Sequence, residues 1–361
     1  MLKKVWLIIF VIFMVLAGEI SAISLNLPKL ELNAPKSNIT QPVITPTEIV
    51  MHKSLAAVIP PVEKTQEFLF VGDIMLDRNV EALMNKNGVE YPFEKIKDFL
   101  NSQNFVIANL EGPIVAQPKN FGDHAVQFAF ASTADDLLQI NHINLVSLAN
   151  NHTLNMGQKG LLETRNYLQT DKISAIGDPL LCTQDFIYKK DNLIFLGLNK
   201  TFATSCPDDE IIKLISGIKK EEPDKFLIAF MHWGNEYKTV NSKTQQDLGH
   251  KMLDAGADLI IGSHPHVVQN IELYKNKLIF YSLGNFIFDQ YFSKDVQQGL
   301  AISLEINNNK QNYNIYPIQS IKSQPSLMAG DDKSKFLADL AARSSKELGD
   351  KIKAGEIIIN F

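Results

Sequence analysis

Six short apolar runs, each followed by polar residues, constrain the fold of this chain more than any other feature. The runs begin near residues 68, 105, 144, 226, 259 and 278 and are typical of strands buried on both faces. The polar residues that follow them are Asp73, Glu111, Asn151 with His152, His232, His264 with His266, and Asn285. In an open α/β sheet, ligands bind at the carboxyl ends of the strands. The pattern therefore predicts an α/β fold with one polar site at that edge.

The stretch from Asp258 to Gln269 shows the pattern most clearly. Its apolar run ends at Gly262, and the chain passes directly to His264 and His266. Proline fixes its own φ and disfavours the helical region for the residue before it, so Pro265 predicts an extended His264 and two rings held apart. Such a pair can clamp a cation or a phosphoryl group. The alternative is a surface loop that happens to contain two histidines.

The predicted site combines carboxylates, an amide and imidazoles without sulfur, which is the ligand set of Mn, Zn or Fe. These groups outnumber the ligands of a single tetrahedral zinc, so one or two metal ions are expected. The predicted ligands are Asp73, Glu111, Asn151, His232, His264 and His266. For Asp73, capping of the following helix is the alternative role.

Arg78 is one of three arginines in a chain that otherwise uses lysine. It lies about one helical turn beyond Asp73, and its planar guanidinium suits a carboxylate or phosphate. The alternative is a solvated position on the helix surface.

Composition excludes several classes of protein. A net charge of −5 argues against a nucleic-acid surface, which normally carries a basic stripe. Cys182 and Cys206 are the only cysteines, too few for a disulfide framework or a thiolate metal cluster. One disulfide is possible in an oxidising compartment, and the spacing leaves this open.

Residues 1–22 read as a signal peptide or an N-terminal membrane anchor, because Lys3 and Lys4 precede an apolar run over residues 5–17. Such lysines keep the amino end cytoplasmic. We therefore expect a single-pass protein of the cell membrane with its bulk outside, or a secreted one if the segment is cleaved. Residues 23–66 are predicted to form an extended linker, since six of the fifteen prolines lie between Pro28 and Pro61.

The folded domain is expected over residues 67–320. Residues 321–361 carry no catalytic pattern and are interpreted as an accessory segment, with a helix over 331–348 and a closing strand over 356–361.

Several ordered motifs between residues 68 and 299 resemble the bacterial capsule-synthesis CapA family, also called poly-γ-glutamate synthesis proteins. They are Gly72-Asp-Ile-Met-Leu-Asp-Arg78, Tyr91-Pro-Phe93, Asn109-Leu-Glu111, Ser147-Leu-Ala-Asn-Asn-His152, His232-Trp-Gly-Asn-Glu-Tyr237, Asp254-Ala-Gly-Ala-Asp258, His264-Pro-His-Val-Val-Gln269 and Tyr281-Ser-Leu-Gly-Asn-Phe286. The resemblance implies a four-layer α/β/β/α sandwich of the metallophosphoesterase (calcineurin-like) type. It also implies a role in synthesis, export or anchoring of an anionic capsule polymer such as poly-γ-glutamate, beside other capsule-synthesis membrane subunits.

The resemblance also implies roles for individual residues. Asp73 matches the first-strand aspartate of the metallophosphoesterase pattern, and Glu111 stands where a bridging aspartate is usual. Asn151 matches a ligand, and His152 matches the acid outside the metal shell. The usual Asp-x-His motif has Met75 at its third position here, so one ligand of the pattern is absent.

Two hypotheses follow. In the first, the protein is a metal-dependent hydrolase or transferase, in which His152 protonates the leaving group and Arg78 orients an anionic oxygen. Asn285 and Glu236 are its predicted substrate contacts. In the second, the protein binds polymer or metal without catalysis. Met75 favours the second hypothesis, and His152 favours the first.

Overall fold

The computed structural model describes residues 66–122, 126–307 and 310–360. The predicted signal or anchor, and all of the predicted linker except Gln66, lie outside the described residues. Within these described ranges, no helix is long and apolar enough to cross a bilayer.

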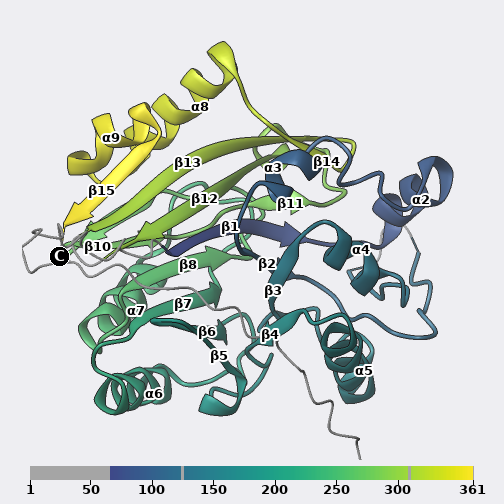
Figure 1. The fold of residues 1–361 in the computed structure, drawn as a ribbon, viewed down its shortest axis with the longest axis horizontal. Helices are drawn as coiled ribbons and strands as arrows, with labels where there is room; N and C mark the ends of the chain where they lie inside the picture. Colours follow the sequence, from purple (N-terminus) through teal and green to yellow (C-terminus); the bar gives the residue numbers. More distant parts are fainter. Residues whose placement is uncertain (1–65, 123–125, 308–309, 361) are drawn as a thin grey trace, which may run out of the picture. The chain divides into compact units, whose positions relative to one another are not determined.

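Strands and helices alternate over most of the described chain, as the sequence predicts (Figure 1). In chain order the main elements are β1 (Gln66–Ile74), α2 (Arg78–Asn87), α3 (Lys97–Asn101), β2 (Val106–Leu110), α4 (Ala134–Ile140), β3 (Ile143–Ser147), α5 (Gly157–Thr170), β4 (Ser174–Ile176), β5 (Ile187–Lys190), β6 (Leu193–Asn199), α6 (Asp208–Glu221), β7 (Phe226–His232), α7 (Lys243–Asp254), β8 (Leu259–Ser263), β9 (Ile271–Tyr274), β10 (Lys277–Phe280), β11 (Asn285–Ile287), β12 (Gln298–Ile306), β13 (Lys310–Ile321), β14 (Gln324–Leu327), α8 (Gly330–Arg343), α9 (Gly349–Ala354) and β15 (Glu356–Asn360). Short 3₁₀ turns at Gln184–Phe186, Asp295–Gln297 and Lys346–Leu348 complete the order.

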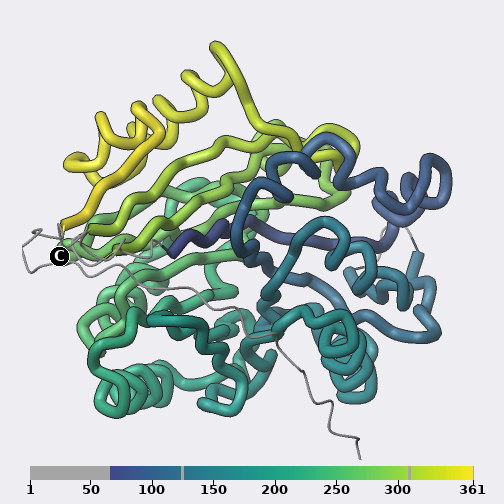
Figure 2. Tube along the Cα trace, in the orientation of Figure 1, coloured from purple at the N-terminus to yellow at the C-terminus, as the bar shows by residue number. Residues whose placement is uncertain are grey.

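Two sheets form among the described residues. The larger sheet has nine strands in the order β14-β13-β12-β1-β2-β3-β4, with β11 beside β1 and β15 beside β13. The smaller sheet has six strands in the order β5-β6-β7-β8-β10-β9. Strands β1 to β4 run parallel to one another, and so do β6, β7, β8 and β10. Figure 2 shows β1, in purple, running between β12 and β2.

Alternation of apolar side chains along the strands builds the layers, because successive residues of a strand point to opposite faces. In β1, Phe68 and Phe70 enter the core between the two sheets, whereas Leu69 and Val71 face the core under α2 to α5. On the other side, α6 and α7 cover the outer face of the smaller sheet (Figure 1). The predicted four-layer α/β/β/α sandwich is therefore confirmed.

The segment over residues 321–361 continues the larger sheet, since β14 and β15 both pair with β13. The predicted long helix is interrupted at Ser344 and Ser345. The Ile271 N–H donates to Ser344 Oγ at 2.9 Å, and the Ser345 N–H donates to the Ile271 carbonyl at 3.0 Å. These bonds to β9 replace the helical ones, so α8 and α9 are separate helices.

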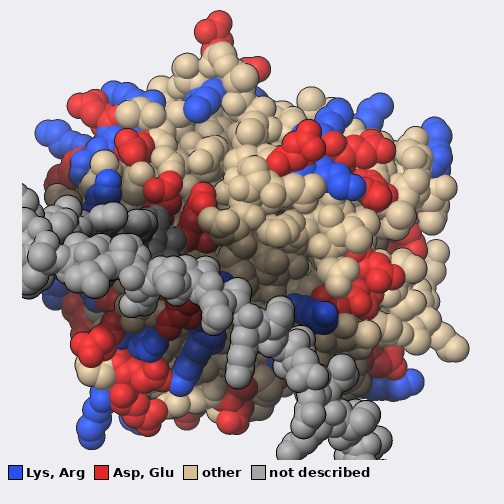
Figure 3. Space-filling model, viewed as in Figure 1, with Lys and Arg blue, Asp and Glu red and all other residues tan. Residues whose placement is uncertain are grey.

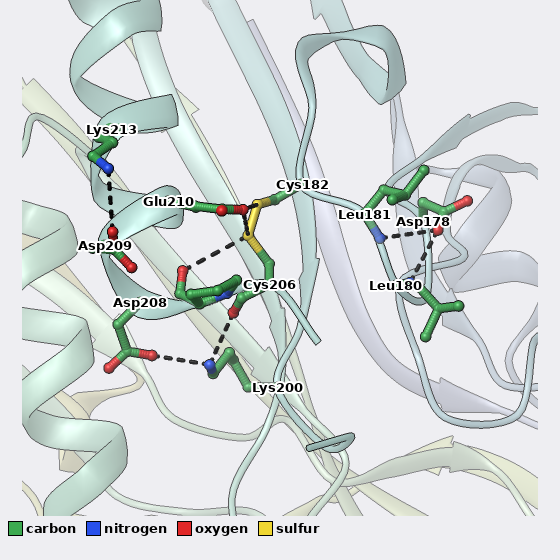
Figure 4. The surroundings of a disulfide bond; sticks show 11 residues. Asp178, Leu180, Leu181, Cys182, Lys200, Cys206, Asp208, Asp209, Glu210 and Lys213 are labelled. Carbon is green, nitrogen blue, oxygen red and sulfur yellow. Dashed lines mark hydrogen bonds and ion pairs between the residues drawn. A yellow bond between two sulfur atoms is a disulfide. The ribbon is translucent and has the colours of Figure 1, made fainter. Parts of the chain in front are cut away.

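Cys182 and Cys206 form a disulfide with Cα atoms 5.7 Å apart. Their spacing in the sequence leaves open whether they pair. Figure 4 shows the carboxylate of Glu210 beside the two sulfur atoms. The bond joins the crossover from β4 to β5 with the start of α6. It therefore fastens the connection between the two sheets.

Candidate metal centre

The ends of parallel strands from both sheets meet at one buried point. Asp73 is the second-last residue of β1 and Glu111 follows β2 in the larger sheet, whereas His232 ends β7 in the smaller sheet. Each is almost completely buried, and one ligand atom from each lies within 4.8 Å of the other two. Side chains that are distant in the sequence are thus brought within the reach of one cation.

A second set of three ligand atoms, from Glu236, His264 and His266, also lies within 4.8 Å. Glu236 is exposed, and both histidines are buried. The sequence predicts Glu236 to contact substrate, but its position beside the two imidazoles also suits a metal ligand. The rings of His232 and His264 are 4.8 Å apart, so the two sets are neighbours.

Asn109 connects the acidic and imidazole groups, and the sequence interpretation gives it no role. Its Nδ2 donates to Asp73 Oδ1 at 2.8 Å and to Glu111 Oε2 at 3.3 Å, and it lies 3.4 Å from His232 Nδ1. Residues two apart on a strand share a face. An amide two positions before Glu111, at the end of a run predicted to be a buried strand, was the sequence signal that could have revealed the role of Asn109.

The segment after β3 carries Asn151 and His152. Asn151 Oδ1 lies 2.7 Å from His232 Nε2, and its Nδ2 lies 3.0 Å from His152 Nε2. His152 Nδ1 lies 3.1 Å from Asn155 Oδ1, which as an amide oxygen can only accept. His152 therefore carries its proton on Nδ1 and a lone pair on Nε2, 3.6 Å from Glu111 Oε1.

Two histidine rings are held by polar side chains behind them. Asn285 Oδ1 lies 3.0 Å from His266 Nδ1, while its Nδ2 donates to Gln290 and to the Val296 carbonyl. Ser263 Oγ lies 3.0 Å from His232 Nδ1. Such contacts fix ring orientation in metal sites. Asn285, predicted as a substrate contact, is buried and has this geometry of an orienting residue.

Burial sets the protonation of the cluster. It raises the pKa of the Glu111 carboxyl well above its usual value, and it lowers the pKa of His232 well below its own. Burial also lowers the pKa of His264 to about 3 and that of His152 to about 4. These three imidazoles are neutral at neutral pH, which is the form that binds metals.

His266 is the exception among the imidazoles. Burial alone would lower its pKa, but the carboxylates of Glu111 and Asp73 outweigh this and raise it to about 9. His266 Nδ1 lies 3.5 Å from Asp73 Oδ2, and its Nε2 lies 3.6 Å from Glu111 Oε1. We assign the proton of the Glu111–His266 pair to the imidazole, because one imidazolium compensates two buried carboxylates. A metal ion could compensate them in its place.

Two buried atoms of the cluster, Glu111 Oε1 and His264 Nδ1, have no hydrogen-bond partner among the described residues. A buried polar atom without a partner is unfavourable by about 1–3 kcal/mol, so such atoms need an explanation. Both belong to the sets described above and are typical ligand atoms of borderline metals. The residues present therefore fit a divalent cation.

The backbone is strained around this cluster. Tyr237, His264 and His266 have positive φ values of 61°, 95° and 58°, a region that non-glycine residues rarely adopt. The prediction that Pro265 makes His264 extended is wrong. The Tyr237 N–H donates to the Pro265 carbonyl at 2.8 Å, and the His264 N–H lies 3.4 Å from Asp73 Oδ2. These tertiary contacts override the local preference, and such strain concentrates at functional sites.

Arg78 begins α2, where Asp77 rather than Asp73 caps the helix. Its side chain is largely buried and forms an ion pair with Asp289, which disagrees with a solvated helix position. The guanidinium also lies 4.7 Å from the centre of the Phe128 ring, and that ring is 4.3 Å from the ring of His152. Arg78 thus packs behind His152, with the Phe128 ring in contact with both side chains.

Met75, at the position where the metallophosphoesterase pattern has histidine, is buried, and its sulfur accepts from the Asp77 N–H at 3.1 Å. Glu236, which the pattern does not include, stands beside His264 and His266. The ligand set therefore differs from the pattern in composition.

Fold and site together define an α/β/β/α protein with a candidate metal centre where two sheets meet. The family profile described as bacterial capsule synthesis protein PGA_cap matches residues 67–180 and 188–290, which together are more than half of the chain. The chain belongs to this family, as the motifs predict.

Named relatives agree with this assignment. The chain is 28% identical over 318 residues to the capsule biosynthesis protein CapA of Bacillus anthracis, covering 80% of this chain and 77% of the relative. It is also 28% identical over 282 residues to the PGA biosynthesis protein CapA of Bacillus subtilis, covering 73% of each. Among solved structures, a purple acid phosphatase from yellow lupin seeds matches with a TM-score of 0.37 and 14% identity, over 70% of this chain and 52% of that one. That likeness is too low to define the fold, which rests on the layers described above.

Proposed function

We propose that this protein is a metal-dependent hydrolase or transferase that acts on an anionic capsule polymer, such as poly-γ-glutamate, at the outer face of the cell membrane. The observation that carries the proposal is the buried set of Asp73, Glu111 and His232, with the imidazole of His152 beside it. The side chain of His152 is 12% exposed, so it is the member of this group that can also contact substrate.

The ligand atoms divide into two places for a cation. Asp73, Glu111 and His232 would hold one ion, and His264, His266 and Glu236 would hold a second. Asn151 Oδ1, close to His232 Nε2, would join the first set. A divalent ion such as Mn, Zn or Fe supplies Lewis acidity and lowers the pKa of bound water.

His152 moves the proton in this proposal. Since Nδ1–H donates to Asn155, Nε2 can accept a proton from the attacking nucleophile. The same nitrogen then returns the proton to the leaving group, which agrees with the acid role that the resemblance implies. Arg78, stacked on Phe128 and paired with Asp289, keeps the His152 ring in place. The predicted contact of Arg78 with an anionic oxygen stays a prediction.

A second candidate function is binding of polymer or metal without turnover. The specific observation that favours it is Met75, whose thioether stands where the metallophosphoesterase pattern has an imidazole ligand and accepts a hydrogen bond from the Asp77 N–H instead.

Location and partners are part of the proposal. Disulfides persist in oxidising compartments, so the Cys182–Cys206 bond supports a position outside the cytoplasm. The apolar run over residues 5–17 would anchor the protein beside other membrane subunits of capsule synthesis. Acidic and basic side chains are interspersed on the face drawn in Figure 3, and the expectation that nucleic acid is not a partner stays a prediction.

The test compares the full-length protein with His152→Gln and with His250→Gln, a control on α7 that lies outside the metal sets. Bound metal is measured by elemental analysis, and turnover is measured on γ-glutamyl and phosphoester substrates. Catalysis predicts bound metal in all three proteins and a loss of turnover in His152→Gln alone. Bound metal without turnover in any of the three proteins would support the binding function instead. Absence of metal from the native protein would refute both the metal-dependent enzyme and the metal-binding function.

A further inference from the structure

Two aromatic side chains are exposed at the mouth of the candidate metal centre. Tyr237 is 43% exposed and Phe292 is 67% exposed. Their ring centres are 5.1 Å apart, and the planes are nearly perpendicular at 84°. Paired aromatic rings supply a large apolar surface, and an exposed patch of this kind often marks a binding site.

This aromatic pair lies next to the second set of ligand atoms, that of Glu236, His264 and His266. The ring of Tyr237 lies over that of His266, with centres 6.2 Å apart and planes 30° from parallel. Tyr237 directly follows Glu236, and its strained backbone is held by the bond to Pro265. Its hydroxyl accepts from Gln290 Nε2 at 3.3 Å. Tyr237 is therefore held in place, and the aromatic pair begins beside the second set of ligand atoms.

The loop that carries Tyr237 also lines a hollow of about 290 Å³. Its lining residues are Asn235, Lys238, Thr239, Val240, Ser242 and Gln245. Lys238 is the one cation among them, and the others offer amide, hydroxyl and methyl groups. One ammonium among neutral groups suits a ligand with widely spaced single carboxylates.

We propose that Tyr237, Phe292 and Lys238 form a polymer subsite that holds an anionic polyamide across the mouth of the metal centre. The inference rests on the proposed function and assigns the residues that position its substrate. Planar amides and short methylene stretches of a γ-linked glutamate chain would lie on the two rings, and a side carboxylate would meet Lys238. Glu236 faces the same ligand with a negative charge, which bound metal would offset.

The test measures binding rather than turnover, using the full-length, metal-loaded protein and a fluorescent γ-linked glutamate oligomer in an anisotropy titration. Tyr237→Asn removes the ring while tolerating the positive φ, and Tyr237→Phe keeps the ring. Phe292→Ala and Lys238→Gln remove the other two contacts. The matched controls lie on α5: Leu162→Ala, where the native side chain is 62% exposed, and Lys159→Gln, where it is 89% exposed.

Tyr237→Asn and Phe292→Ala are each expected to raise the Kd by about 3- to 10-fold, as loss of aromatic contacts predicts. Lys238→Gln is expected to raise it by up to about 5-fold and to lose most of that effect at high salt. Tyr237→Phe and both controls should bind as the native protein does, and metal content should be equal in all.

Three results would overturn the inference. If the native protein binds the oligomer and the subsite variants bind it equally well, the subsite is wrong while the proposed function stands. If the native protein does not bind the oligomer at all, the polyamide substrate of the proposed function fails first. If an unlabelled anionic polysaccharide displaces the oligomer as well as an unlabelled glutamate chain does, the rings contact sugars rather than amides.

Discussion

The two sheets contribute different ligands to the candidate metal centre, and the residues that each sheet contributes are called its rim. The larger sheet contributes carboxylates and amides, through Asp73, Asn109 and Glu111. The smaller sheet contributes imidazoles, through His232 and the histidines that follow β8. The first ligand set needs both sheets, because it takes two carboxylates from the larger sheet and one imidazole from the smaller one, whereas all of the second set, Glu236 included, follows β7 and β8 of the smaller sheet.

This difference shows that the first ligand set depends on the packing of one sheet against the other. The apolar core between them holds Phe70 of β1 and Phe230 of β7, with ring centres 6.2 Å apart. Asp73 lies near the end of β1, and His232 ends β7. A shift between the sheets would therefore separate the acid ligands from the imidazole ligands.

The largest effect is expected from Phe230→Ala, which should lower the free energy of unfolding by about 3–5 kcal/mol, since it leaves a cavity between the sheets. Denaturant unfolding measures the loss, and bound metal should fall with it because both rims move. Leu162→Ala, on exposed α5, should stay within about 0.5 kcal/mol of the native protein. Equal losses in the two variants would contradict the dependence on sheet packing.

Removing the disulfide with Cys182→Ser and Cys206→Ser should cost about 3 kcal/mol, because the bond closes a loop between residues 24 apart. Thermal and denaturant unfolding would show the loss. Metal affinity should be unchanged, since the bond fastens the crossover and not the strand ends. A parallel loss of metal would show that the crossover also positions the rims.

Asp73→Asn and His266→Gln test the two rims separately. Each should lower the affinity of one metal set on the order of 100-fold, or about 2.7 kcal/mol, because a ligand is lost outright. Calorimetric titration with Mn²⁺ or Zn²⁺ would show one strong site remaining in each variant. Loss of both sites in either variant would mean that the two sets form a single unit.

The smallest effect is expected from Asn109→Ala, which removes the amide that joins the rims. Metal affinity should fall about 10-fold, as for other supports of metal ligands. Asn104→Ala is the matched control, because this exposed amide just before β2 bonds Glu67 instead. If the two variants bind metal equally, the amide does not connect the rims.

The strand ends were predictable because apolar runs and the polar residues after them are local signals. The runs near residues 226 and 259 became β7 and β8 with nearly the expected bounds. Their division into two sheets was not predictable from periodicity, because a buried strand reads the same in either sheet. The resemblance, and not the pattern, supplied the four layers.

Contacts between distant segments account for what the sequence did not reveal. The φ of His264 is positive, although Pro265 follows it, because Asp73 and Tyr237 hold the loop on both sides. The pairing of Arg78 with Asp289 joins segments that no local rule connects. Candidate ligands could be named from single strand ends, whereas their grouping into two sets required the folded chain.

The position of β1 has a consequence for how the chain reaches this fold. Gln66 pairs with Ile306, so the first described strand takes one of its neighbours from β12. Until that part has been synthesised, one edge of β1 remains open, and open strand edges promote aggregation. The edge of β1 formed by residues 66–70 is therefore covered only when nearly the whole polypeptide has been made, and a nascent chain that stalls before β12 is expected to bind chaperones.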